Sequence, residues 1–405
     1  MRDGWREATL GEIAHINPEK TPRWDPEHQI RYVDIASVAW GRRLNGDIPR
    51  IRFGQAPGRA RRRIRWGDVV VSTVRPNLRA MAVIPEELDG EVASTGLAVV
   101  RAKEDVAIPG FIWALVSHAG FSEDMVSKAT GSNYPAVRAE DVAGYRVVLP
   151  SLVEQRRIVD LIAALDDTIQ ATADAEAAAW ALSSQVADEV AKPLLTGAAG
   201  TLSDLVTLVD CEHRTAPAAS DRGFAYSVGT GNVRDGLISL VDAKPISEET
   251  FTEWTQRAVP APGDIVLTRE APPGESGLVT AELGPIALGQ RTVLLQPKPG
   301  VHGPFVWALL TSPTYRDWIR NRSVGQTVRR INVREILRIP VSAIPLAEQV
   351  AVATRLQAVV AAAVESRVVV AQAKTFRSNL LTALLSGVHE IPASYDDLLL
   401  EGVAA

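Results

Sequence analysis

The stretch LPSLVEQRRIVDLIAALDDTIQ occupies residues 149–170 and decides how the rest of the chain is organised. A second stretch, IPLAEQVAVATRLQAVVAAA at residues 344–363, repeats its beginning: a proline, then Glu-Gln, then a long run without a helix breaker. Glu348 lies 194 positions after Glu154 (348 minus 154), and both runs end in Leu-Leu-(Thr/Ser)-Gly. The chain therefore consists of two similar halves.

Both runs have the pattern of long helices that pair. Apolar or small residues alternate by four and three from Ile158 and again from Val352, which is heptad spacing. Neither helix can bury its apolar stripe alone, so we expect the helices at 151–197 and 345–388 to pair antiparallel as a coiled coil, with an outer face open to partners. The main seam residues are Ile158, Ile162, Leu165, Ile169, Leu356, Val359, Leu380 and Leu384.

The remaining parts, 1–150 and 198–344, are mixed and rich in short strands. The turn and strand that begin at Trp66-Gly67-Asp68 return at Pro262-Gly263-Asp264, and the helical run Phe111–Leu115 returns at Phe305–Leu309. Between these anchors the two copies differ in sequence and length. The sequence predicts an α+β protein with two mixed α/β domains joined by the two long helices, followed by a tail at 389–405.

Bulk composition is that of a globular protein in a reducing compartment. The chain has 405 residues, of which 46% are hydrophobic and 22% charged, and it has one cysteine, Cys211. We find no uninterrupted apolar run of about 18 residues and no apolar core of a secretion signal near the first residue, so we expect a cytoplasmic protein. The net charge of −5 hides two basic stretches, Arg42–Arg65 and Arg316–Arg338.

The sequence lacks the usual marks of an enzyme. It has no GxxxxGK[ST] phosphate loop and no Asn-Pro-Pro-aromatic or Asp-Pro-Pro-Tyr motif of an amino-methyltransferase. Six scattered histidines predict no metal site, and we interpret Cys211 as a buried structural thiol near a surface histidine, His213. Asp264 and Glu270 faintly resemble a nuclease carboxylate pair, but no lysine follows and Asp68 has no matching glutamate. We expect no catalytic residues.

Polar and basic loops point instead to a polyanion, and we favour DNA. Arginine can bind phosphate or guanine, while Asn and Gln can read adenine. The candidates in the first half are Arg59, Arg61, Arg62, Arg63, Arg75, Asn77, Arg79, Thr130, Ser132, Asn133, Tyr134 and Arg138. Those in the second half are Arg269, Gln290, Arg291, Asn321, Arg322, Gln326, Thr327, Arg329 and Arg330, together with Asn332.

These features resemble one known family, the specificity subunits of type I restriction–modification systems. The run from Pro150 through Glu154-Gln155 to Ile158, which opens the first long helix, is similar to the conserved helices of that family, and Ile344–Gln349 repeats its beginning with one residue fewer between the proline and the glutamate. Thr130-Gly131-Ser132-x-Tyr134 resembles the loop that precedes the helix. The resemblance covers essentially the whole chain. The second half departs from it by having Gly325-Gln326-Thr327 in that loop.

The resemblance implies that 1–150 and 198–344 are target-recognition domains, each reading one half of a bipartite DNA sequence. The helices at 151–197 and 345–388 would set the unread spacer and dock two methyltransferase subunits. Those subunits use S-adenosylmethionine, and a restriction/translocase subunit joins them. The chain itself would bind no cofactor, and its partners would supply part of the phosphate neutralisation.

Two other readings stay open on the residues alone. The same kind of subunit could serve a methylation-based phage-defence system other than type I. A protein of another class, a two-headed scaffold that binds proteins, would also need a repeated layout and long helices. The basic loops argue against the scaffold.

Overall fold

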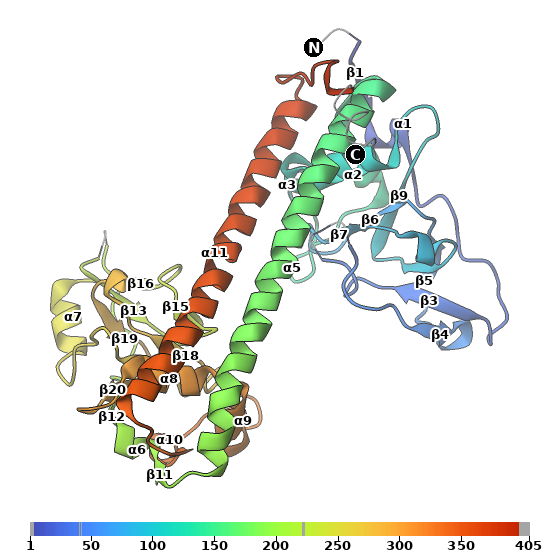
Figure 1. Cartoon of the computed structure of the whole chain (residues 1–405). Coiled ribbons are helices and arrows are strands. Elements are labelled where there is room, and N and C mark those ends of the chain that lie inside the picture. The colour runs from blue at the N-terminus through green and yellow to red at the C-terminus, as the bar shows by residue number, and fades with distance from the viewer. Residues whose placement is uncertain (1–3, 40, 42, 221–222, 397–405) are drawn as a thin grey trace. The chain divides into compact units, whose positions relative to one another are not determined.

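The structure is a computed structural model that describes residues 4–39, 41, 43–220 and 223–396. Arg42 of the first basic stretch and residues 397–405 of the predicted tail lie outside the described residues. The chain forms two compact units, which Figure 1 colours by residue number. Unit 1 comprises Met1–Thr172 and Val369–Ala405, and unit 2 comprises Ala173–Val368. Each unit takes in a part of both long helices, whereas the sequence-based division gave the helices segments of their own.

The two long helices are α5 (Leu152–Thr196) and α11 (Leu346–Leu385). Alanine-rich sequence gives both a high helix propensity, and α5 ends just before Gly197, whose N–H donates to Pro193 O at 2.9 Å. Within unit 1 they run antiparallel, because Ile158 packs near Leu384 while Asp166 pairs with Arg377. Within unit 2 the direction is the same, with Ala187 near Leu356 and Glu176 paired with Arg367.

Unit 1 holds two four-stranded sheets and a two-stranded sheet. The first has the order β2-β9-β6-β7 and is antiparallel throughout. The second has the order β4-β3-β8-β5, with β3 and β8 parallel. The strands are β1 (Arg6–Thr9), β2 (Ala14–Ile16), β3 (Gln29–Val33), β4 (Arg50–Arg52), β5 (Ala60–Arg63), β6 (Val69–Ser72), β7 (Met81–Val83), β8 (Val92–Ser94), β9 (Leu97–Ala102) and β10 (Arg146–Leu149), with β1 paired to β10.

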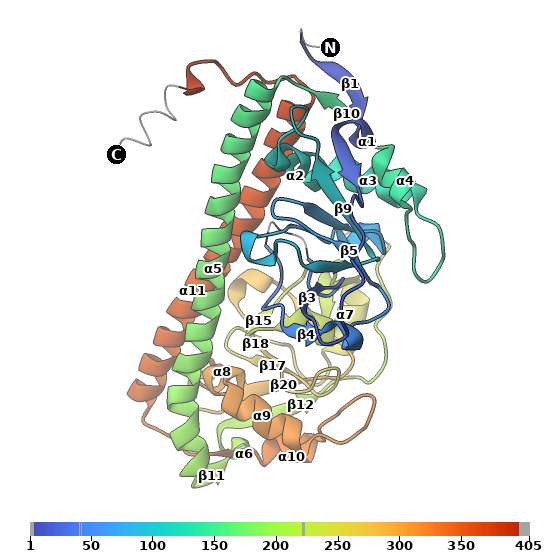
Figure 2. The same ribbon diagram turned by 90° about the vertical axis from the view of Figure 1, so that its right-hand side faces the viewer.

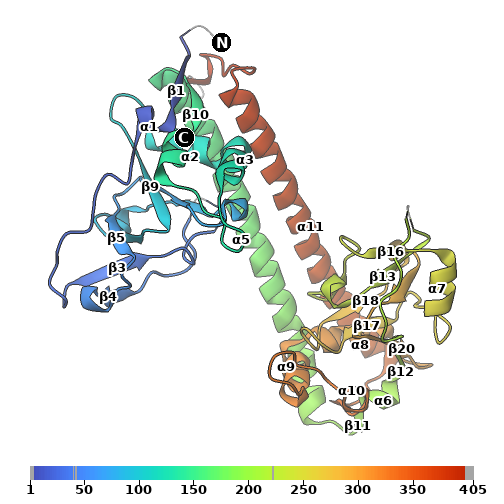
Figure 3. The same ribbon diagram turned by 180° about the vertical axis from the view of Figure 1, so that it is seen from behind.

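Unit 2, whose strands Figure 3 shows, has a similar but not identical topology, because its second sheet has three strands instead of four and it has an additional two-stranded pair. Its four-stranded sheet has the order β12-β20-β17-β18, its second sheet is β16-β13-β19 with β13 and β19 parallel, and β11 pairs with β21. The strands are β11 (Gly200–Thr201), β12 (Val206–Asp210), β13 (Ala225–Val228), β14 (Val233–Arg234), β15 (Leu237–Ile238), β16 (Lys244–Ile246), β17 (Ile265–Thr268), β18 (Ser276–Leu278), β19 (Ile286–Leu288), β20 (Thr292–Pro297) and β21 (Pro340–Val341).

Short helices complete each unit, and among the described residues unit 2 has one more than unit 1. Unit 1 has α1 (Leu10–Ile13), α2 (Pro109–Ser117), α3 (Ala119–Lys128) and α4 (Ala139–Ala143). Unit 2 has α6 (Leu202–Leu205), α7 (Glu248–Trp254), α8 (Gly303–Thr311), α9 (Pro313–Arg322) and α10 (Val333–Leu337). Helices α2 and α8 are buried on nearly every side because each lies between the antiparallel sheet and the long helices. The predicted fold class, a mixture of helix and sheet with long helices, is confirmed.

The repeated glutamines explain why the Glu-Gln pair occurs twice. Gln155 is fully buried; its side-chain oxygen accepts from Ile108 N at 3.1 Å, and its amide donates to Val106 O and Pro150 O. Gln349 is also buried, accepting from His302 N at 2.8 Å and donating to Ile344 O. Each glutamine therefore joins the start of a long helix to the loop that precedes α2 or α8, and it satisfies backbone groups that burial would otherwise leave unpaired.

The repeated Gly-Asp pairs are turns. The Asp68 carboxylate accepts from Arg65 N at 2.7 Å, and that of Asp264 accepts from Ala261 N at 3.0 Å. Both carboxylates are buried, and burial raises the pKa of each. Asp68 is paired with Arg101. The Asp264 carboxylate also accepts from the Gln296 side chain at 3.2 Å.

Helix α11 is long and apolar enough, by length and composition alone, to cross a membrane. The same property belongs to core helices of soluble proteins, and α11 contributes buried side chains to both units, among them Leu356 and Leu381. Its central charge, Arg367, pairs with Glu176 at 2.8 Å.

Candidate nucleic-acid interface

In unit 1, backbone hydrogen bonds bring three of the predicted DNA-binding segments to one edge. Thr95 N donates to Arg59 O at 2.9 Å, which ties the start of β5 to the turn between β8 and β9. Thr73 N donates to Gly96 O at 2.9 Å, and Arg75 N donates to Pro135 O at 2.7 Å. The exit of β6 thus lies between the β8–β9 turn and the loop 130–136. We call these segments the loop edge of unit 1.

The loop 130–136 is closed by backbone atoms. Thr130 N donates to Ala136 O at 3.0 Å, and the reciprocal bond is 2.9 Å. Gly131 has a φ of +101°, and a Cβ there would lie 3.2 Å from Tyr134 O, so glycine is required. The Tyr134 side chain is 69% exposed and lies 4.8 Å from the Arg75 guanidinium, a cation–π contact. An exposed aromatic ring and a cation therefore stand together at the tip.

Unit 2 builds the same edge with other residues. Arg269 N donates to Arg291 O at 2.8 Å, and Ile331 N donates to Arg269 O at 3.0 Å. Val324 and Arg330 exchange two backbone hydrogen bonds of 2.9 Å, which close the loop 324–330. Figure 2 shows each loop extending from its own unit, between α3 and α4 in unit 1 and between α9 and α10 in unit 2.

Most of the predicted DNA-binding side chains are exposed at or near these loop edges. Arg322 stacks on Trp318 at 3.8 Å, and Arg291 pairs with Glu270 at 3.3 Å. Within the described ranges, Arg59, Arg329 and Arg330 have no carboxylate at salt-bridge distance. The exposed residues of the predicted set are Arg59, Arg61, Arg75, Asn77, Thr130, Ser132, Asn133, Tyr134, Arg138, Arg291, Asn321, Arg322, Gln326, Thr327, Arg329 and Arg330.

Three predicted arginines turn inward. Arg79 donates to Ser117 O at 2.8 Å, and burial lowers its pKa. Arg269 donates to both carboxylate oxygens of Asp210, at 2.9 and 3.0 Å, with its side chain 15% exposed. Arg62 donates to Leu97 O and is also partly buried. These guanidinium groups bind backbone and carboxylate groups inside their own units. They therefore support the loop edge and are not part of its exposed surface.

Two further predicted residues are half-buried at the edge. Arg63 donates to Gly90 O at 3.3 Å, and Gln290 donates to His213 O at 3.3 Å. Of the predicted seam residues on the long helices, Ile158, Ile162, Ile169, Leu356 and Leu384 are buried, while Leu165, Val359 and Leu380 are half-buried.

Asp210, Cys211 and His213 bring three potential metal-ligand atoms within 4.8 Å of one another. The Asp210 carboxylate, however, is already paired with Arg269 and with His213 at 3.1 Å. Cys211 is buried and His213 is exposed, as interpreted from the sequence. A cation would have to compete with the arginine, so the cluster is typical of a structural hydrogen-bond network.

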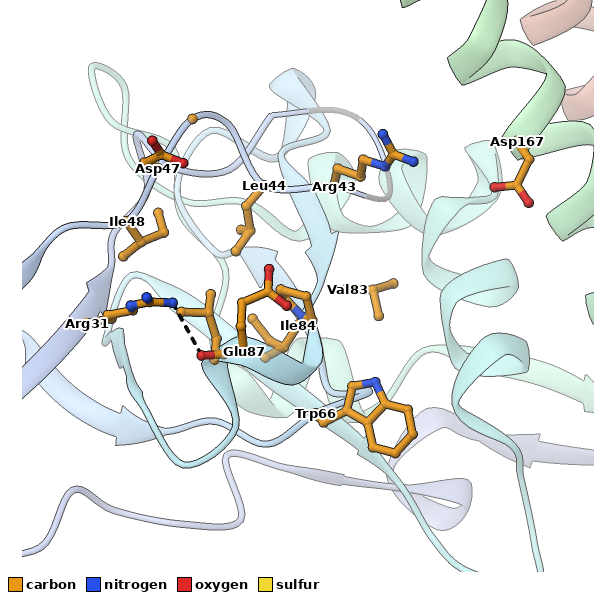
Figure 4. Close-up of a pocket in the computed structure, with 13 residues that line it drawn as sticks. Arg31, Arg43, Leu44, Asp47, Ile48, Trp66, Val83, Ile84, Glu87 and Asp167 are labelled. Atoms are coloured by element: carbon orange, nitrogen blue, oxygen red, sulfur yellow. Dashed lines mark hydrogen bonds between the residues drawn. The ribbon is translucent and has the colours of Figure 1, made fainter.

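A groove of about 630 Å³ lies on unit 1 beside β7 (Figure 4). Figure 4 shows Arg31 and Arg43 on the same groove as Asp47, Glu87 and Asp167. The Arg31 guanidinium donates to Glu87 O at 3.4 Å. With both signs of charge along its wall, this groove has no preference for a polyanion.

A second groove, of about 820 Å³, adjoins the loop edge of unit 1 and was not predicted from the sequence. It is lined by Trp24, Phe53, Lys20, Arg61 and Thr95 among others. Trp24 and Lys20 lie in a segment without periodicity, and only the closeness of a lysine, an arginine and a tryptophan at 20–24 could have drawn attention to it.

No family model matches the chain. Over 168 residues it is 24% identical to the type I restriction enzyme HindI specificity subunit of Haemophilus influenzae, a match that covers 41% of this chain and 36% of that relative. Among solved structures, a chain from work on assembly and conformational transition of the type I R-M system has 24% identity and a TM-score of 0.56, covering 95% of this chain and 98% of that one.

A type I restriction–modification S subunit from M. genitalium gives a TM-score of 0.55 at 12% identity, covering 96% of this chain and 97% of that chain. These likenesses confirm the fold, and the curated relative agrees with the resemblance seen in the residues. The matched segment spans about a third of that relative's length.

Proposed function

We propose that this chain is the DNA sequence-specificity subunit of a type I restriction–modification complex. Each unit reads one half of a bipartite target through its loop edge. The long helices set the length of the unread spacer and dock the methyltransferase subunits. The chain contributes recognition, while methylation and cleavage belong to its partners.

One observation carries the proposal: the same edge is built twice with different side chains. The frames agree in the strand order of the antiparallel four-stranded sheet and in the paired backbone bonds that close the loops 130–136 and 324–330. Their tips differ, with Ser132, Asn133 and Tyr134 in one and Gln326 and Thr327 in the other. Two copies of one scaffold with different polar tips are suited to reading two different short sequences.

Methylation and cleavage of the DNA require partner subunits, because we assign only recognition to this chain. Double-stranded DNA, two methyltransferase subunits and a restriction/translocase subunit complete the assembly, and the methyltransferase uses S-adenosylmethionine. The net charge of −5 fits a subunit that shares phosphate neutralisation with its partners. The assembly works in the cytoplasm.

A domain exchange tests the proposal. The full chain is co-expressed with its methyltransferase subunits, and methylated adenines are mapped across the host genome. We expect one bipartite motif with fixed spacing. Replacing residues 1–150 by the same segment of another such subunit should change one half of that motif and leave the other half and the spacing intact. A change in both halves, or in neither, would overturn the assignment.

Loop variants give a finer test within each unit. Arg329→Ala with Arg330→Ala should weaken methylation through one half of the motif, and Arg75→Ala with Tyr134→Ala through the other. The matched control is Arg6→Ala with Arg146→Ala, two exposed arginines on β1 and β10 outside the loop edge. If the control variant alters the motif as strongly, the loop edges are not the reading surfaces.

Two alternative functions predict different results for the methylation map, for cleavage of phage DNA and for DNA binding. A subunit serving another methylation-based phage-defence system would give the motif, but unmethylated phage DNA would not be cut by a restriction/translocase subunit. A two-headed protein scaffold would give no motif and no salt-dependent DNA binding by the complex. The repeated loop edge favours DNA over the scaffold because cationic and amide side chains gather there in both units.

A further inference from the structure

We propose that the 820 Å³ groove of unit 1 binds the sugar–phosphate backbone of DNA that flanks the half-site read by that unit. The inference rests on the proposed function and adds a second contact surface to it. The groove lies between the segment 17–24 and the segment 53–62, and it is lined by residues of both.

The walls of the groove are fixed before any ligand arrives. Thr21 N donates to Arg61 O at 3.0 Å, and Arg63 N donates to Glu19 O at 3.2 Å. On the other side Phe53 N donates to His28 O at 2.8 Å. Because backbone bonds hold both segments, binding there costs little ordering of the chain.

Trp24 forms part of the wall and is already packed. His28 lies 4.6 Å from its ring, Phe53 meets it edge-to-face at 5.6 Å, and the Arg63 guanidinium lies 5.9 Å from it. A stacking platform for an unpaired base needs a ring that is free to accept one. A ring held by three neighbours instead supplies apolar surface, which suits the deoxyribose of an intact duplex.

The charges along the groove favour phosphate. Lys20, Arg23 and Arg61 are exposed cations on its lining. The carboxylate there, Glu19, pairs with Arg65 at 3.2 Å and with Arg101, and the hydrogen bond from Arg65 is the main reason that its pKa is lowered. Since Glu19 is neutralised by its own partners, the surface offered to a ligand is positive.

The groove is continuous with the loop edge. Thr95 lines the groove, and its N–H donates to Arg59 O at 2.9 Å. The next residue, Gly96, accepts from Thr73 N beside the exit of β6. A duplex that contacts the loop edge therefore meets the groove along the same border of the unit, and the phosphates beyond the bases being read fall on Lys20 and Arg23.

The test measures how DNA affinity of the complex with its methyltransferase subunits depends on salt. The variant is Lys20→Gln with Arg23→Gln, which removes two positive charges from the groove lining and leaves polar side chains in their place. The slope of log K against log [salt] is negative, and each lost phosphate contact should reduce its magnitude by about 0.9, so we expect a reduction of roughly 2 for the double variant. The ratio of target to non-target affinity should stay the same. The matched control, Arg6→Gln with Arg146→Gln on β1 and β10, should leave the slope unchanged.

The outcomes separate the two proposals. If the unaltered complex binds DNA without sequence preference, the proposed function fails. If it binds its target selectively and the groove variant keeps the original slope, the groove is not a backbone site and this inference fails alone. A groove variant that loses target selectivity would also overturn it, because the groove would then read bases. Protection of flanking backbone from hydroxyl radicals, lost in the variant, would support it.

Discussion

Arg377 on α11 pairs with Asp166 on α5 within unit 1, and it is one of the largest fully enclosed side chains of the chain, 2% exposed. The indole N–H of Trp113 donates to the same carboxylate at 3.1 Å, and Arg377 donates to the Ser117 hydroxyl at 3.1 Å. The residues 194 positions away, Val360 and Ser183, carry no charge (360 minus 166, 377 minus 183). The pair is therefore specific to unit 1.

Replacing one member of this pair should destabilise unit 1 strongly. Arg377→Ser leaves the Asp166 carboxylate in a poorly hydrated place, and we expect a loss of about 3–5 kcal/mol in the free energy of unfolding. The double variant Asp166→Val with Arg377→Ser copies the residues of unit 2 and should recover much of that loss. Guanidinium titrations compare them, with Arg355→Ser on an exposed site of α11 as control. Equal stabilities for the single and double variants would contradict the reasoning.

The glycines of the two closed loops should tolerate no side chain. A Cβ on Gly325 would lie 2.3 Å from Val328 O, and the φ of this glycine is +114°. Gly325→Ala should therefore distort the loop 324–330 and abolish methylation at the target, while the melting temperature changes little because the loop is exposed. Gly231→Ala is the control, since nothing lies within 4 Å of its Cβ. Full methylation by Gly325→Ala would show that the loop is not used.

The stability of unit 1 should depend on pH through His118. Its Nδ1 accepts from Gly120 N at 3.2 Å, its Nε2 lies 2.9 Å from the Thr382 hydroxyl, and burial is the main reason that its pKa is lowered. The folded state thus binds the proton less readily than the unfolded state, whose pKa is about 6.5. The contribution is complete above that pH and is lost as the pH falls through the folded pKa.

Melting curves between pH 8 and pH 5 test this dependence. His118→Asn keeps an acceptor at the start of α3 and removes the titrating group. We expect the melting temperature of the variant to fall less than that of the original chain as the solution is acidified. Parallel curves for the two proteins would exclude His118 as the cause.

The two long helices should be sensitive to charge at Leu356 above all. Leu356 is 2% exposed in the core of unit 2, and a buried leucine contributes about 1.5–3 kcal/mol relative to exposure. Leu356→Asp adds an unpaired carboxylate and should unfold unit 2, whereas Leu165→Asp at a half-buried site of unit 1 should cost less. Circular dichroism and methylation assays measure both, with Leu182→Asp, 48% exposed, as control. Retained methylation by both variants would show that the helix pair does not set the spacing.

The long helices and the repeated turns could be predicted from the sequence because each depends on residues that are close together in the chain. The heptad spacing from Ile158 and Val352 depends only on helical geometry, and the doubled Glu-Gln and Gly-Asp pairs mark positions where a buried amide or a turn is needed twice. The direction in which a long side chain points cannot be predicted in this way. Arg79 and Arg75 are four residues apart, yet one donates to a carbonyl of α2 and the other lies on Tyr134. That choice depends on partners distant in sequence.

The groove at Trp24 was missed for the same reason. Its two walls come from segments some thirty residues apart, and neither has a periodic pattern. Only the pairing of Thr21 with Arg61 and of Phe53 with His28 brings the cations and rings together.

The closure of the loops 130–136 and 324–330 by backbone atoms has a consequence for evolution. The bonds between Thr130 and Ala136, and between Val324 and Arg330, depend on no side chain. Substitutions at the tips therefore change the chemistry that a loop presents without altering the fold that supports it. Under the proposed function, a new target sequence needs only a few substitutions at the tips or the exchange of one segment, and the same frame supports each one.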